Sequence, residues 1–280
     1  SGTHQDAKLC LAAGYIASVD TWQAFDRRWR LRLSASGVPD FHAEAFFGRD
    51  KNGKRRRLFQ HLTHRQASDL ISDLATIIHD TDVNPIKSSV HVADFVAFTE
   101  DERRYLTGAY WDGGKLTWTI SGSPHRPFYL PFQHVILGAL EHSDGAEPVD
   151  FTFDQHNVLY GYMRDLYNQL RARSTRTEHA DMRPLVAKMG QILEGKRQSD
   201  PALQASDLLA YCWYRRGLCE LNDEPLPRDL RQCLAVLSRK SNTMVLFDRA
   251  RMQRNLDAVP LSIRDGSADS RRGPRQLQPS

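Results

Sequence analysis

The chain has 280 residues, of which 40% are hydrophobic and 26% are charged. This composition is typical of a globular protein and excludes a collagen-like repeat, a disulfide scaffold and a low-complexity chain. The net charge is only +4. No apolar run approaches the roughly 18 residues of a membrane span, and the four cysteines contain no C-x-x-C pair, so we expect a cytoplasmic protein with no membrane partner.

Strand and helix patterns alternate through the first part of the chain. Lys8–Ser18 is short and apolar, which predicts a buried strand. A helix should begin at Asp20 and end before Gly37. Phe41–Phe47 begins by alternating apolar and polar residues, which predicts a second strand. Next in order we predict a helix from Thr63 to about Asp80, a strand over Ile86–Phe98 and a short helix over Thr99–Leu106.

The second half of the chain continues this alternation. Gly108–Pro127 has no clear period, and we expect it to be irregular. The order of strands and helices predicts an α/β protein with helices packed on a mixed sheet. The elements predicted here are a helix over Phe128–His142, a strand over Val149–Asp154, a helix over Val158–Arg173, a strand over Met189–Lys196, and helices over Pro201–Cys219, Arg228–Lys240 and Leu246–Leu256.

Positive charge is concentrated in residues 49–57. Six basic side chains stand there against the single acid Asp50, so the rest of the chain is close to neutral. Such a concentration is typical of a contact site for phosphates or acidic partners, and a solvated loop tip is the alternative. The basic residues are Arg49, Lys51, Lys54, Arg55, Arg56 and Arg57.

Two acidic residues stand out by position. Asp154 ends a predicted strand, where its carboxylate would emerge at a sheet edge, although it could instead cap the following helix. Asp207 lies within a very apolar helix. An unpaired carboxylate buried there would cost several kcal/mol, so Asp207 should reach solvent, bind a metal, or pair with a base, either Lys196 or a nearby arginine.

His42 and Glu44 form a further candidate pair. They are two residues apart on a predicted strand, which places both side chains on one face. Glu44 could then be an oxygen ligand for Mg²⁺ or Mn²⁺, while His42 could orient it, activate water or contact a phosphate. An ordinary polar strand face is the alternative. No zinc-hydrolase, serine-hydrolase or P-loop motif is present.

Four segments taken together resemble one known family. They are Ser1-Gly2-Thr3-His4, Phe41-His42-Ala43, Phe153-Asp154 and the run from Asp200 to Tyr211. Over about residues 1–217 the chain is similar to the bacterial domain-of-unknown-function family numbered 3800. Members of that family resemble ribonuclease H in fold and close the domain with a Gln-x-Ala-Asp-Leu-x-Ala-Tyr helix, in which Ser206 replaces the alanine here.

The resemblance implies an α/β fold, a ribonuclease H-like mixed sheet flanked by helices, with extra C-terminal helices. It places this domain at residues 1–220, followed by a C-terminal helical extension at 221–262 and a tail at 263–280 that its composition predicts to be disordered. In the family the first Asp and Glu would precede Ser1, so we expect the first strand to be missing or truncated.

The resemblance also implies a function, a metal-dependent nuclease or phosphodiesterase that acts on DNA or RNA. Carboxylates would hold Mg²⁺ or Mn²⁺ for hydrolysis of a phosphodiester. Asp154 and Asp207 match the family's later acidic positions, His42 its histidine and Lys196 a recurrent basic position. Strand geometry adds Glu44 as a metal ligand. Contacts to the nucleic-acid backbone would come from Lys51, Lys54, Arg55, Arg56 and Arg57.

Two other interpretations stay open. The chain could be a non-catalytic nucleic-acid or partner-binding module that keeps the fold, with a place in mobile-element or phage-defence biology. Alternatively, Asp154 and Asp207 could be only a helix cap and a salt-bridge partner in a protein with an unrelated site. The sequence leaves the oligomeric state open.

Overall fold

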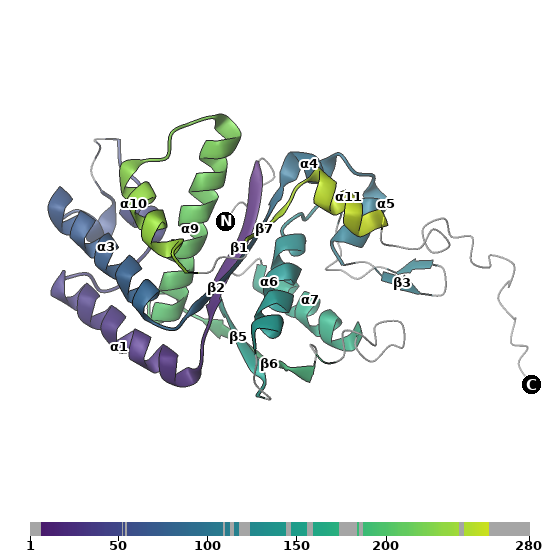
Figure 1. Ribbon diagram of the computed structural model, residues 1–280, viewed down its shortest axis with the longest axis horizontal. Helices are drawn as coiled ribbons and strands as arrows, with labels where there is room; N and C mark the ends of the chain where they lie inside the picture. Colours follow the sequence, from purple (N-terminus) through teal and green to yellow (C-terminus); the bar gives the residue numbers. More distant parts are fainter. Residues whose placement is uncertain are drawn as a thin grey trace, which may run out of the picture.

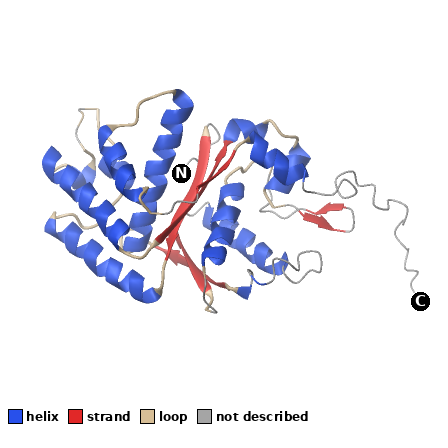
Figure 2. Cartoon of the chain, in the orientation of Figure 1, coloured by secondary structure: helices blue, strands red, loops and turns tan. Residues whose placement is uncertain are grey.

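The structure is a computed structural model, in which helices pack on both faces of a small mixed sheet (Figures 1 and 2). This arrangement confirms the predicted mixed α/β class. The residues that the structure describes are 7–51, 53, 55–108, 110–112, 115–117, 124–143, 147–155, 159–173, 184, 187–240 and 244–257.

The central sheet has the strand order β1-β2-β7. Strand β1 (Leu9–Ile16) pairs antiparallel with β2 (Asn84–His91) along its whole length. Strand β7 (Met244–Phe247) pairs parallel with the other edge of β2. Successive strand residues point to opposite faces, so the two faces of the sheet have separate cores.

Asp154 lies at the end of a strand in a second, two-stranded sheet. Strand β5 (Val149–Asp154) runs parallel to β6 (Met189–Gly195), with Asp154 opposite Gly195. A Cβ atom at Gly195 would lie 2.7 Å from Leu203 Cδ1 and 2.8 Å from Thr152 Cγ2. Glycine is therefore needed where the end of β6 approaches the helix that follows it.

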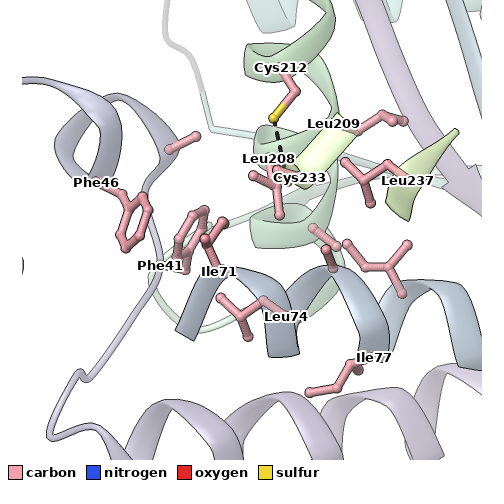
Figure 3. Close-up of a cluster of buried hydrophobic side chains, with 14 of the residues drawn as sticks. Phe41, Phe46, Ile71, Leu74, Ile77, Leu208, Leu209, Cys212, Cys233 and Leu237 are labelled. Atoms are coloured by element: carbon pink, nitrogen blue, oxygen red, sulfur yellow. Dashed lines mark hydrogen bonds between the residues drawn. The ribbon is translucent and has the colours of Figure 1, made fainter. Parts of the chain in front are cut away.

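One face of the central sheet is covered by a bundle of long helices. Figure 3 shows apolar side chains of these helices gathered in one core, with Leu208 toward Ile71 and Leu209 beside Leu237. One helix of the bundle begins directly after Thr63, as the sequence predicts. The Thr63 hydroxyl and the Gln66 side chain form a capping box at its start. The bundle consists of α1 (Val19–Ala35), α3 (His64–Asp80), α9 (Pro201–Asn222) and α10 (Arg228–Leu237).

The opposite face carries the remaining helices. Residues Cys10 and Val90 of the sheet pack against them in one core, while Ile86 belongs to another core that extends to β5 and β6. The helices on this side are α4 (Val92–Val96), α5 (Glu100–Leu106), α6 (Tyr129–His142), α7 (Leu159–Arg173) and α11 (Arg249–Asp257) (Figure 1).

Three sequence-based predictions of secondary structure were wrong. The strand predicted at Phe41–Phe47 is a short helix, α2 (Ala43–Phe47), preceded by His42. The strand predicted at Ile86–Phe98 ends at His91, where α4 begins. The helix predicted at Leu246–Leu256 is divided into β7 and α11. In each case the segment is too short for periodicity to separate a strand from a buried helix.

Two further regions differ from expectation. The irregular region Gly108–Pro127 contains a small hairpin of β3 (Tyr110–Asp112) and β4 (Lys115–Thr117). The predicted C-terminal helical extension also contains a strand, because β7 joins the central sheet. Its helix α10 packs on α3. The predicted disordered tail at 263–280 lies outside the described residues. None of the described helices has the length and apolar character needed to cross a bilayer.

The four cysteines are buried free thiols, with the Cys212 sulfur 3.8 Å from that of Cys233 (Figure 3). Burial raises the pKa of Cys10 to about 11 and that of Cys212 well above its usual value. Because the thiolate is the reactive form, we expect essentially no reaction with an aromatic disulfide reagent at pH 8 in the folded protein and four reactive thiols after denaturation. Rapid labelling of native thiols would contradict this packing.

Candidate functional site

Segments far apart in the sequence meet around Asp207. The backbone N–H of Ala43, at the start of α2, donates to Asp207 Oδ2 at 2.8 Å. The backbone N–H of Arg197, in the loop between β6 and α9, donates to Asp154 Oδ1 at 3.2 Å. We call Asp154, Asp207, His42 and Arg197 the carboxylate cluster, because each of the other three acts electrostatically on the Asp207 carboxylate.

The groups around Asp207 shift the pKa of its carboxyl in opposite directions. Burial raises the pKa of this carboxyl above its ordinary value, and the nearby Asp154 adds to the increase. The Ala43 N–H, His42 and Arg197 oppose it but do not cancel it. The Asp154 carboxyl is exposed at the end of β5, and a cation or a proton nearby would relieve the repulsion between the two like charges. That Asp154 and Asp207 bind one metal ion stays a prediction.

Arg197 is the basic residue of the cluster. Its Nη1 donates to the Phe41 carbonyl at 2.6 Å and to Asp40 Oδ1 at 3.2 Å, which fixes the guanidinium beside the loop before α2. Lys196 is exposed, and the nearby arginine that the sequence left as the alternative base is Arg197. Both residues belong to a turn in which the Ser199 N–H donates to the Lys196 carbonyl, and sequence position alone does not specify which of the two side chains faces Asp207.

Gln204 holds the loops of the carboxylate cluster together and was not among the predicted site residues. Its side chain is only 2% exposed. Its Oε1 accepts from the indole N–H of Trp29 at 2.8 Å and from the Phe41 N–H at 3.0 Å, and its Nε2 donates to the Arg197 carbonyl at 2.9 Å. A glutamine in an apolar helical segment was the available signal, because a buried amide needs partners.

His42 and Glu44 do not form the predicted same-face pair. His42 is the N-cap residue of α2 and Glu44 lies in its first turn, where residues two apart point to different sides of the helix. The Glu44 side chain is 66% exposed, and its Oε1 lies 3.8 Å from Arg56 Nη1. His42 therefore joins the carboxylate cluster, while Glu44 lies outside it.

The basic segment does not act as a single exposed patch. Arg55 is 7% exposed, lies over the Phe46 ring, and donates to the Phe46 carbonyl at 2.6 Å and to Asp229 Oδ2 at 3.1 Å. It therefore links the loop before α3 to α10. Lys51 and Arg56 are exposed, Lys54 lies outside the described residues, and the Arg57 side chain is not described.

The described part of the carboxylate cluster fits a divalent cation only in part. Within the described residues, no group of three or more His, Cys, Asp or Glu side chains could hold a metal ion together. Mg²⁺ can be bound through one or two carboxylates while keeping several waters. Asp154 and Asp207 are the two carboxylates of the cluster that could act in this way, and the negative charge of Asp154 adds to the raised pKa of Asp207.

Fold and site together define a mixed α/β protein with two carboxylates and a guanidinium gathered where the end of a parallel strand approaches a long helix. Comparisons of the chain with protein-family models, with curated proteins and with solved structures found no match.

Proposed function

We propose that this protein is a metal-dependent phosphodiesterase or nuclease of the ribonuclease H-like type, which uses Mg²⁺ or Mn²⁺ and acts on nucleic acid. The observation that carries the proposal is the link that Arg197 makes between the two acids. Its N–H donates to Asp154 Oδ1 at 3.2 Å and its guanidinium to the Phe41 carbonyl at 2.6 Å, two residues before Ala43, whose N–H donates to Asp207 Oδ2 at 2.8 Å. Carboxylates brought together in this way are the oxygen ligands that hard divalent cations prefer. When bound, such a cation activates water and stabilises the charge of a phosphodiester under hydrolysis.

The residues around the two acids have separate roles in this proposal. The Ala43 N–H holds one oxygen of Asp207 at 2.8 Å and leaves the carboxylate oriented. The Arg197 guanidinium, fixed by Asp40 and the Phe41 carbonyl, supplies positive charge close to a phosphate. His42 lies close enough to Asp207 to favour its ionised form and would hold or transfer a proton at its imidazole.

Metal binding tests the proposal directly. Titration calorimetry with Mn²⁺ should show binding to the wild-type chain and at least about tenfold weaker binding to Asp154→Asn and to Asp207→Asn, since each variant loses one anionic ligand. Affinity should rise with pH, because a proton competes with the metal for the Asp207 carboxyl, whose pKa burial raises. Hydrolysis of a fluorescent oligonucleotide with Mn²⁺ should be lost in both variants.

Glu147→Gln provides the control, because this exposed acid precedes the opposite end of β5. It removes the same charge and should leave Mn²⁺ affinity and hydrolysis unchanged. Unchanged Mn²⁺ binding in Asp154→Asn and Asp207→Asn would overturn the proposed metal site.

A second candidate function is a non-catalytic module that binds nucleic acid or another partner. The observation in its favour is that the described residues contain no metal-binding group of three or more side chains. This function predicts nucleic-acid binding in a chelator, no hydrolysis with Mn²⁺, and the same affinity in Asp154→Asn and the wild type.

A further inference from the structure

A buried polar cluster lies between β2 and α9. Lys87 and Ser89 are two residues apart on β2, so their side chains point to the same face of the sheet. Ile86 and Val90, at the alternate positions, pack in the cores of the opposite face. Lys87 and Ser89 are both fully buried, so their polar groups depend on partners inside the protein.

Trp213 of α9 lies at the level of Ser89. Helix α9 packs along β1 in the opposite direction (Figure 1), and a Cβ atom at Gly217 would lie 2.6 Å from Leu9 Cδ2. Trp213 is about 6 Å along the helix from Gly217, and Leu11 is about 7 Å along the strand from Leu9. Leu11 is paired with Ser89 across the sheet, so Trp213 and Ser89 face each other.

Two cations lie over the Trp213 ring. Lys87 Nζ is 4.2 Å and the Arg216 guanidinium carbon 4.9 Å from the centre of the ring. Arg216 donates through Nε to Glu220 Oε1 at 2.7 Å, and Glu220 is 62% exposed, so this ion pair lies at the surface. Burial, with a smaller contribution from Arg216, lowers the pKa of Lys87 to about 8. The surroundings of Lys87 therefore do not stabilise its positive charge.

Two hydrogen-bond donors of the cluster lack an acceptor. In the part of the chain that the structure describes, neither Trp213 Nε1 nor Ser89 Oγ has a hydrogen-bond partner, although both atoms are buried. Buried polar groups of this kind are uncommon in folded proteins and are typical of places where an ion or a water binds. A water would accept from both donors but would not compensate the charge of Lys87, whereas an anion would do both.

We propose that Lys87, Ser89 and Trp213 form a binding site for a small inorganic anion of the size of chloride. The Trp213 N–H and the Ser89 hydroxyl donate to the anion, and the Lys87 ammonium compensates its charge. The Arg216 side chain, which is 45% exposed, adds positive charge on the side of the cluster nearest to solvent. This inference does not depend on the proposed function, because none of these residues belongs to the carboxylate cluster.

Thermal unfolding in chloride tests the site. Sodium chloride replaces sodium methanesulfonate at a constant total of about 200 mM, so ionic screening stays the same and only the anion changes. Because an anion that binds only the folded protein stabilises it, the unfolding midpoint of the wild type should be about 4 °C higher in chloride. Lys87→Met should lose this shift, and Ser89→Ala and Trp213→Phe should each reduce it by at least about half, since each removes one donor.

Ser88→Ala is the matched control. It removes a buried hydroxyl from the neighbouring position on the opposite face, where Ser88 Oγ donates to the Val245 carbonyl at 3.2 Å. This variant should unfold at a lower temperature in both salts and keep the chloride shift. Equal midpoints of the wild type in the two salts would overturn the site. A chloride shift that persists in Lys87→Met, or that Ser88→Ala loses as fully as Ser89→Ala, would also overturn it.

Discussion

Replacing Gln204 with leucine is expected to lower the free energy of unfolding by about 4 kcal/mol. The substitution leaves the Trp29 indole N–H and the Phe41 N–H without their acceptor, and it removes one of the two donors to the Arg197 carbonyl, which keeps the Asp200 N–H at 3.3 Å. Each buried group that loses its hydrogen bond costs about 1–3 kcal/mol. Urea unfolding should show a lower midpoint with an unchanged slope.

Two comparison variants make this result specific. Gln198→Leu changes an exposed glutamine of the neighbouring loop and should shift stability by less than about 0.5 kcal/mol. Trp29→Phe removes one hydrogen bond of the network together with part of a fully buried ring, so its cost combines the lost hydrogen bond with a cavity in the core. If Gln204→Leu costs under about 1 kcal/mol, the network does not contribute as its geometry indicates.

Replacing Lys87 with methionine is expected to raise the free energy of unfolding at pH 7 by about 2 kcal/mol. The Lys87 side chain is fully buried in β2, with its Nζ 4.2 Å from the centre of the Trp213 ring. Burial lowers the pKa of Lys87 from 10.5 to about 8, with a smaller contribution from Arg216. Keeping the ammonium charged in the fold therefore costs about 3 kcal/mol, which the contact with Trp213 offsets in part.

The pH dependence of stability tests whether burial of the Lys87 ammonium is the cause. The pKa in the folded state, about 8, is below the value of 10.5 expected after unfolding. Between these values the unfolded chain binds a proton that the folded chain lacks, so the stability of the wild type rises with pH. The advantage of Lys87→Met should be complete below pH 8, decline through this window and vanish above pH 10.5.

Lys8→Met is the matched control, since it removes an exposed ammonium at the start of the same sheet. It should change stability by less than about 0.5 kcal/mol. A Lys87→Met variant that is less stable than the wild type at pH 7, with no change in the difference up to pH 10.5, would show that burial does not determine the behaviour of this lysine.

The sequence indicates the two acids of the candidate site, but it does not indicate the residues that surround them. Asp154 followed from a strand that ends in an acid, and Asp207 from the cost of a carboxylate in an apolar helix. The sequence allowed a nearby arginine beside Asp207 without identifying Arg197, and it did not indicate Gln204, because the contacts of both residues depend on Phe41, more than 150 residues away in sequence. The pair of His42 and Glu44 failed because a brief alternation of apolar and polar residues does not distinguish a strand from a single helical turn.

The sequence by itself determined the long elements of this protein. The helix at His64–Asp80 follows from its apolar period and from the capping pair of Thr63 and Gln66, and α9 begins where Asp200 and Pro201 predict. These are local effects, because each involves residues within a few positions of one another. They are sufficient for the mixed α/β class.

Only the tertiary structure decided which charged residues are available for chemistry. Arg55 belongs to the most basic segment of the chain, yet it is buried against Asp229, while Arg215 has no carboxylate partner among the described residues. The physical reason is that burying a charge is tolerated only where the fold supplies its partner. That partner is 174 residues away for Arg55, and no local pattern in the sequence specifies a contact over such a distance.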